Sequence, residues 1–175
     1  VVLSYTIEDE HGASSSSTAT VTVTGANDAP TIDAGGTTAT GSVAELPDND
    51  PGENATVHTA GGAIAFDDLD ASDTHTAGFA AQGGGYLGSF TLDSVDQSGD
   101  SVGWDFNVSA ADLDTLAEGE ILAQTYTITI DDGNGGTTTQ DVTVTITGAA
   151  DGPPAWYNDN SAVGSANLGT QADPY

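Results

Sequence analysis

The feature of this sequence that most constrains its fold is a pattern that occurs twice, about 120 residues apart. Residues 5–30 read YTIEDEHGASSSSTATVTVTGANDAP, and residues 126–153 read YTITIDDGNGGTTTQDVTVTITGAADGP. The two copies are 121 residues apart when counted from Tyr5 and Tyr126, and 123 residues apart when counted from the VTVTG and VTITG runs. A repeat of about 120 residues has the length of one domain.

The positions of the two copies predict the domain organisation. Residues 26–149 hold one complete repeat. We interpret residues 1–25 as the terminal hairpin of a preceding repeat, or as strands exchanged with another subunit. Residues 150–175 form a linker or tail. Within it, Trp156 and Tyr157 are candidate assembly residues, because two large aromatic side chains stand in a polar, Gly- and Asn-rich stretch.

Both copies of the pattern predict β-hairpins. In residues 126–130 and 142–147, apolar and polar residues alternate with period two, as in a strand with one buried face. Between them, Asp131 to Gly136 provide the Asp, Asn and Gly residues typical of a turn. The same reasoning predicts a hairpin over residues 4–24.

The rest of the complete repeat predicts more strands and one helical turn, which Ser109 can cap and Gly119 can end. Short strands with frequent turn signals and almost no helix predict an all-β fold, a β-sandwich. The further strands are expected at 38–44, 62–67, 75–80, 86–93 and 102–108. The expected core residues are Val43, Ile64, Phe66, Phe79, Leu87, Phe90, Leu92, Trp104, Phe106, Val108, Leu113, Leu116, Ile121, Tyr126, Ile128, Ile130, Val142, Val144 and Ile146.

The charge of the chain excludes several classes of function. It has 27 Asp and Glu residues and neither Lys nor Arg, for a net charge of −27. Without Lys or Arg the chain cannot neutralise phosphates, so we expect no nucleic-acid binding. No apolar run approaches the ~18 residues of a membrane span, so we expect no membrane insertion. So many like charges repel one another, and divalent cations are the obvious means of offsetting that repulsion.

The acidic residues are clustered, which predicts cation binding. The clusters are the pair Asn27 and Asp28, the segment 67–73, the segment 131–134, and Glu45 with the residues around 48–50. Calcium takes six to eight oxygen ligands from carboxylates, carbonyls and amides. The chain has no Cys and only three His residues, which disfavours softer metals. Asp and Asn also favour ordinary turns, so solvated turns are the alternative interpretation.

Catalysis has little support in the sequence. None of the three His residues stands in a recognisable catalytic pattern. For His75, between two Thr residues at a predicted strand start, we expect a hydrogen bond to a loop carboxylate. We therefore expect that the chain is not an enzyme.

Several blocks of the sequence occur in the order of a known repeat. They are GSVAE (41–45), FDDLDASDTHT (66–76), WDFNVS (104–109) and LDTLAEGE (113–120), preceded by the junction VTVTGANDAP (21–30). Together they resemble the VCBS repeat of large secreted bacterial surface adhesins. The resemblance implies a Greek-key, cadherin-like or Ig-like β-sandwich, a tandem array, secretion to the cell surface or medium, calcium binding and a role in adhesion or biofilm matrix.

The resemblance also implies where calcium binds. Cadherin-type sites combine an Asn or Asp of the linker, a Glu at a strand end and a DxD loop at one end of a domain. The matching residue types predict a site for Ca²⁺ at the junction between repeats. The predicted ligands are Asn27, Asp28, Glu45, Asp68, Asp70 and Asp73.

Two functions remain open at this point. The first is a calcium-stiffened spacer in an extracellular adhesin, whose expected partners are neighbouring repeats and polymers of the cell surface or matrix. The second is a processed subunit that assembles with identical subunits into an extracellular filament or sheath. The hairpin in residues 1–25 motivates the second function, since its unpaired edges are suited to strand exchange.

Overall fold

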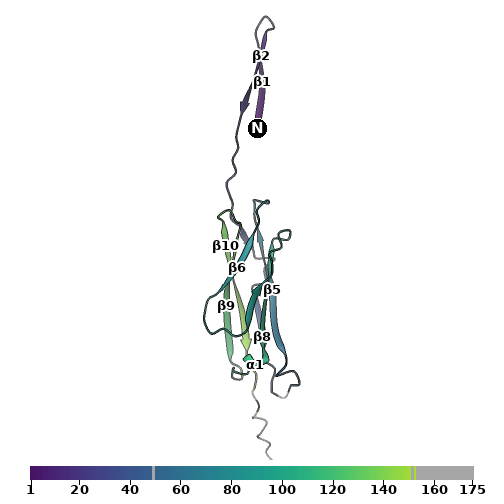
Figure 1. The fold of residues 1–175 in the computed structure, drawn as a ribbon, viewed down its shortest axis with the longest axis vertical. Coiled ribbons are helices and arrows are strands. Elements are labelled where there is room, and N and C mark those ends of the chain that lie inside the picture. Colours follow the sequence, from purple (N-terminus) through teal and green to yellow (C-terminus); the bar gives the residue numbers. More distant parts are fainter. Residues whose placement is uncertain (49, 151, 153–175) are drawn as a thin grey trace, which may run out of the picture.

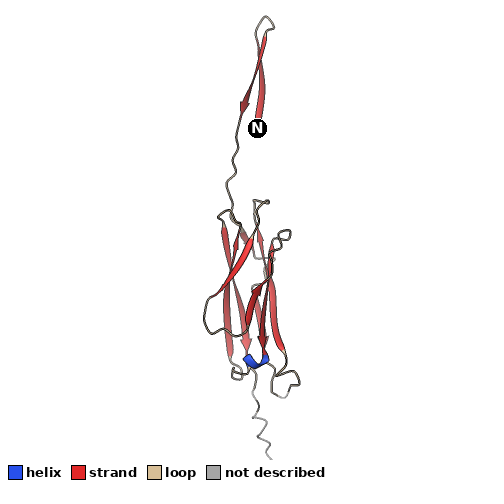
Figure 2. Ribbon diagram, viewed as in Figure 1, coloured by secondary structure: helices blue, strands red, loops and turns tan. Residues whose placement is uncertain are grey.

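The computed structural model describes residues 1–48, 50–150 and 152, and these form an elongated, almost entirely β structure (Figures 1 and 2). The strands and the one short helix are β1 (Val2–Glu8), β2 (Ser14–Thr20), β3 (Thr31–Asp33), β4 (Thr40–Ala44), β5 (Val57–Asp67), β6 (Thr76–Ala81), β7 (Ser89–Leu92), β8 (Ser101–Ser109), α1 (Ala110–Leu113), β9 (Ile121–Asp131) and β10 (Thr137–Thr147). The predicted all-β fold is confirmed.

Strands β3 to β10 form a β-sandwich of two four-stranded sheets, consistent with an Ig-like fold. One sheet has the order β4-β10-β9-β6 and the other the order β3-β5-β8-β7. The predicted hairpin is the β9–β10 pair, in antiparallel register from Ile121–Thr147 to Asp131–Thr137. At the edge of the same sheet, β4 runs parallel to β10. Because the two strands are parallel, β4 and β10 end at the same end of the sandwich, opposite the β9–β10 turn.

The core lies between the two sheets, because each long strand alternates buried and exposed residues with period two. Phe90 stacks between the rings of Trp104 and Tyr126, with centroid distances of 5.7 and 4.2 Å. The indole Nε1–H of Trp104 donates a 2.7 Å hydrogen bond to the carbonyl of Thr38, so this buried polar group is satisfied. The predicted core is largely confirmed, and it also contains Val102, which the prediction omitted.

Two predicted core residues are exposed instead. Ile121 is 69% exposed because the inward-facing residues of β9 have even numbers, so that Ile121 points outward. Phe79 is 44% exposed because β6 is the edge strand of its sheet, although the ring still touches Phe90 with centroids 5.0 Å apart. Leu87 and Leu92 are only partly buried and pack against the margin of the core.

The N-terminal hairpin is a separate two-stranded sheet that projects beyond the sandwich on an extended linker (Figure 1). All residues of β1 and β2 are exposed. The predicted hairpin is present, but β2 ends at Thr20 and does not include residues 21–24. Val21 still pairs with Val1 through its backbone N–H, at 2.8 Å.

The turns of the two hairpins have the same geometry. In each turn, Oδ1 of an aspartate accepts hydrogen bonds from the backbone N–H groups two and four residues further on, at 2.9 and 2.8 Å for Asp9 and at 2.7 and 2.9 Å for Asp132. Asp9 and Asp132 are therefore equivalent positions, 123 residues apart. This offset corrects the alignment of Tyr5 with Tyr126, because it pairs Tyr5 with Ile128 and needs no gap.

Candidate metal centre

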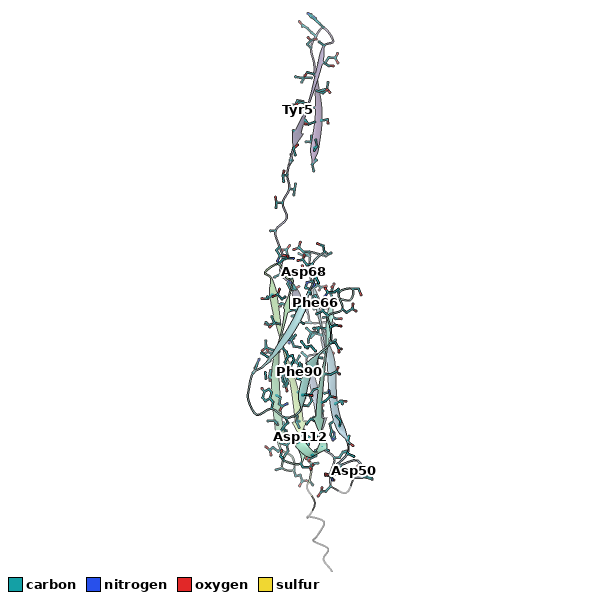
Figure 3. The ribbon with its side chains drawn as sticks, in the orientation of Figure 1. Tyr5, Asp50, Phe66, Asp68, Phe90 and Asp112 are labelled. Carbon is teal, nitrogen blue, oxygen red and sulfur yellow. The ribbon has the colours of Figure 1, made fainter. Side chains whose placement is uncertain are left out.

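The candidate site lies at the end of the sandwich where the linker from the hairpin enters (Figure 3). Three segments meet there: the linker around Asn27, the loop between β5 and β6, and the turn between β9 and β10. The β5–β6 loop crosses from one sheet to the other, and it meets the β9–β10 turn because Thr76, at the start of β6, pairs with Asp131, at the end of β9. Beside them is a hollow of about 570 Å³ that is lined in part by Asp28, Asp68 and Leu69.

The linker is tied to both loops by hydrogen bonds. The side-chain amide of Asn27 donates to Oδ2 of Asp132 at 2.8 Å. The backbone N–H of Asp28 donates to Oδ2 of Asp70 at 2.7 Å. Pro30, at the start of β3, is buried. The position of the linker therefore depends on carboxylates of the sandwich.

A buried His–Asp pair orders the loop between β5 and β6. Nε2 of His75 lies 3.0 Å from Oδ2 of Asp68, and the two side chains are only 4% and 3% exposed. Gln97 holds the backbone of His75 through two hydrogen bonds of 2.9 and 2.7 Å. The imidazole also packs on Phe66 with ring centroids 4.7 Å apart. The expected hydrogen bond of His75 to a loop carboxylate is present, and it fixes the orientation of Asp68.

Three carboxylates converge inside this end of the sandwich. One oxygen from each of Asp68, Asp73 and Asp132 lies within 4.8 Å of the other two. Asp132 is 1% exposed. Among the residues that the structure describes, Oδ2 of Asp73 is buried and has no hydrogen-bond partner. A buried carboxylate oxygen without a donor is costly, and the cost grows with like charges so close to it.

This donor set fits a calcium ion. It offers carboxylate oxygens, which are ligands that Ca²⁺ prefers, and no sulfur. The orphaned Oδ2 of Asp73 is the atom that most requires a cation. The residues that would hold the ion are Asp68, Asp73 and Asp132, with Asp70 and the linker residues Asn27 and Asp28 around them.

Glu45 does not join this cluster. Its Oε2 accepts a 2.7 Å hydrogen bond from the backbone N–H of Ala149, and its own N–H donates to the carbonyl of Thr147. Since β4 runs parallel to β10, it ends where β10 ends, at the opposite end of the sandwich from the β9–β10 turn. Glu45 thus supports the chain as it leaves the sandwich. Trp156 and Tyr157 lie outside the described residues.

Asp132 belongs to the cluster although it was not among the predicted ligands. The sequence shows it only as part of an acidic turn. An Asp side chain in such a turn ordinarily accepts hydrogen bonds from the backbone of the turn. Its second oxygen, Oδ2, points instead to Asn27. Residues 27 and 132 are distant in sequence, so only the packing of the linker against the turn reveals the contact.

The pKa of Asp132 lies below its ordinary value of 3.8, first because of the hydrogen bond from Asn27 and then because of backbone N–H groups, against the opposing effect of desolvation. A lowered folded-state pKa means that the unfolded chain binds more protons in this range, so stability rises with pH there. The contribution of Asp132 is complete above about pH 4 and is lost as the pH falls through the lowered value.

We predict that Asn27→Ala weakens this pH dependence. Without the amide donor, the pKa of Asp132 returns toward its ordinary value, and the contribution to stability below about pH 4 shrinks. Urea unfolding in calcium-free buffer from about pH 6 to about pH 2 measures the difference. Parallel pH profiles for the two proteins would mean that the Asn27–Asp132 bond is absent in solution.

Comparisons with known proteins leave the family open. No family model matches the chain, and no curated protein matches it. AggA, the major subunit of aggregative adherence fimbriae type I from Escherichia coli, has a similar solved structure, with 12% sequence identity, a TM-score of 0.43 and coverage of 70% of this chain and 97% of AggA. This likeness is too distant to assign a role. Within the described part of the chain, no helix has the length and apolar character of a membrane span.

Proposed function

We propose that this chain is a calcium-binding structural repeat of an extracellular bacterial adhesin or biofilm matrix protein, of the VCBS type, and that it acts as a stiffened spacer. The observation that carries the proposal is the convergence of Asp68, Asp73 and Asp132 at the end where the linker enters. A cation bound here would contact the segments that hold the linker. It would therefore stabilise the joint between two modules more than the core of either one.

The coupling between cluster and linker explains how a cation would stiffen the joint. Asn27 and Asp28 are bonded to Asp132 and Asp70, so the linker adopts its path only while these carboxylates keep their positions. Bound Ca²⁺ neutralises the mutual repulsion of the carboxylates and supplies the positive charge that the chain lacks. The His75–Asp68 bond holds one ligand in place beforehand, as second-sphere hydrogen bonds do in metal sites.

A structural role also accounts for the buried histidine of the site. His75, the most buried imidazole, is held by Gln97, Phe66 and Asp68, so it is committed to ordering the loop. We propose no catalytic function. The uniform negative charge of the surface keeps the modules apart unless cations are present, which suits a protein that works in the calcium-rich medium outside the cell.

A second candidate function is a processed subunit of an extracellular filament or sheath. The observation in its favour is the N-terminal hairpin, which has two unpaired strand edges and an exposed apolar face. Strand exchange between identical subunits would cover both. Particle size separates the two functions, because a spacer stays monomeric at calcium concentrations at which a filament subunit polymerises.

Thermal unfolding of residues 1–175 in EDTA and in millimolar Ca²⁺, with light scattering recorded alongside, tests the proposal. We expect about 2.7 kcal/mol of stabilisation per site at 100 times the dissociation constant, which raises Tm by several degrees. NaCl at matched ionic strength should have a much smaller effect, because a site recognises the ion and screening does not. Equal shifts in NaCl and CaCl₂ would mean that the carboxylates are solvated surface.

A further inference from the structure

The N-terminal hairpin exposes an apolar face that is a core face elsewhere in the same chain. On β1, Leu3, Tyr5 and Ile7 are 56, 52 and 67% exposed. With the offset of 123 residues their counterparts on β9 are at most 4% exposed. Val21 and Val23, which follow β2, are likewise exposed, and their counterparts on β10 are fully buried. The counterparts are Tyr126, Ile128, Ile130, Val144 and Ile146.

We propose that β1 and β2 are the last two strands of a second β-sandwich of this repeat type, and that they dock on a segment that precedes Val1 in the same polypeptide and supplies the counterparts of β3–β8. The inference rests on the repeat organisation of the proposed function but not on its cation. It follows from the uncovered face, since an isolated two-stranded hairpin is marginally stable at best in water.

The complete repeat shows what such a segment must provide. The outer edge of β10 pairs with β4 in parallel, and the outer edge of β9 pairs with β6 in antiparallel. The segment must therefore offer one parallel strand to residues 20–24, at and beyond the end of β2, and one antiparallel strand to β1. The opposite sheet must supply large side chains for Leu3, because its counterpart Tyr126 stacks on Phe90 with ring centroids 4.2 Å apart.

The segment must also lengthen the hairpin. β9 begins three residues before the counterpart of Val1. Residues with the pattern of Ile121–Ala123, added before Val1, would pair with Thr22–Thr24 and complete the strand that ends early in this structure. The alternating VTVT sequence of residues 21–24 is that of a paired strand, and its missing partner is the feature that the proposal explains.

A second copy of this chain is a poorer cover. Its sandwich already contains β9 and β10, each of 11 residues, in the positions that the hairpin would take. To enter, β1 and β2, each of 7 residues, would have to displace them. The exchange would lose pairing length and replace β10, which buries Val142, Val144 and Ile146, with the Ser-rich β2, so it gains nothing.

One residue of the hairpin constrains the covering segment further. Gly136 allows the linker to pass close to the β9–β10 turn, since a Cβ at this position would lie 2.7 Å from Cα of Ala29. The counterpart of Gly136 is Ala13, which carries that Cβ. The linker that enters the preceding repeat must therefore run farther from its turn, or have a different contact there.

A chain that carries residues 26–123 of this protein joined directly before Val1 tests the proposal. Since Val1 corresponds to residue 124, this extension supplies β3–β8 and the first residues of β9 in the register that the hairpin requires. A version with Ala13→Gly removes the expected clash with Ala29, so that a failure to dock cannot be attributed to it. Hydrogen exchange of the β1 and β2 amides is measured in residues 1–175, in both extended chains and in the Ile7→Asp variant of each, with particle size by light scattering.

We expect β1 and β2 to exchange rapidly in monomeric 1–175, and to be protected on the order of 100-fold or more in the extended Ala13→Gly chain. Ile7→Asp should abolish that protection and leave the unfolding of 1–175 unchanged. Absence of protection in the extended Ala13→Gly chain would overturn the proposal. Protection in a dimer or larger particle of 1–175 would also overturn it, in favour of a second copy. Measuring in EDTA keeps the result independent of calcium.

Discussion

Ile130→Ala is expected to lower the free energy of unfolding by about 2–5 kcal/mol, while the same substitution at Ile7 leaves it unchanged. The two isoleucines occupy equivalent positions, 123 residues apart, in strands with the same turn geometry. Ile130 is fully buried between the two sheets, so truncation leaves a cavity in a close-packed core. Ile7 is 67% exposed, so truncation removes a side chain that water already surrounds.

Urea unfolding of the two variants beside the parent chain measures this contrast, with Trp104 fluorescence reporting on the sandwich. Because the substitutions are identical, propensity and unfolded-state effects largely cancel between them. A similar loss of stability at Ile7 would show that the hairpin of 1–175 is packed in solution. Since none of the residues that the structure describes covers the hairpin, this result would point to contacts between copies.

Asp73→Asn is expected to have opposite effects with and without calcium. In calcium-free buffer it should raise the free energy of unfolding by on the order of 1 kcal/mol, because it removes one of three converging charges. The new amide N–H also gives the orphaned position a donor that can face the carboxylates of Asp68 and Asp132. In saturating calcium the variant should lose most of the ion-dependent stabilisation, because a neutral amide replaces a charged ligand.

Thermal unfolding with a calcium titration measures both effects, and Glu118→Gln is the matched control. Glu118 is exposed in the segment between α1 and β9, at the other end of the sandwich, and loses the same unit of charge. It should retain the full response to calcium. If Asp73→Asn also retains that response, Asp73 is not a ligand, and the site must be sought elsewhere on this surface.

The sequence predicted the β-sandwich and its strands well, because period-two alternation is a local signal. Each long strand of the sandwich, such as β8, shows it within a few residues. Val102 was not predicted, although it lies two residues before Trp104 in a predicted strand. Residues two apart in a strand face the same side, so the alternation already places Val102 in the core. Ile121 was misplaced for the same reason, since its odd position on β9 already places it on the outer face.

The candidate site was predicted only in part. The acidic segment 67–73 and the linker pair Asn27 and Asp28 do meet at one end of the sandwich. Asp132 joined them and Glu45 did not, because the members of a site are selected by strand direction. A parallel β4 carries Glu45 away from the linker, whereas the hairpin turn returns Asp132 to it.

By itself the sequence determined what is local or additive in this protein: the strands and turns, the repeat of the hairpin, and a net charge of −27. The tertiary structure decided which carboxylates converge and which apolar faces are covered. Ile7 and Ile130 have nearly the same local sequence but opposite exposure. Burial is a property of what packs across a strand, and the strands that pack on Ile130 come from segments distant along the chain.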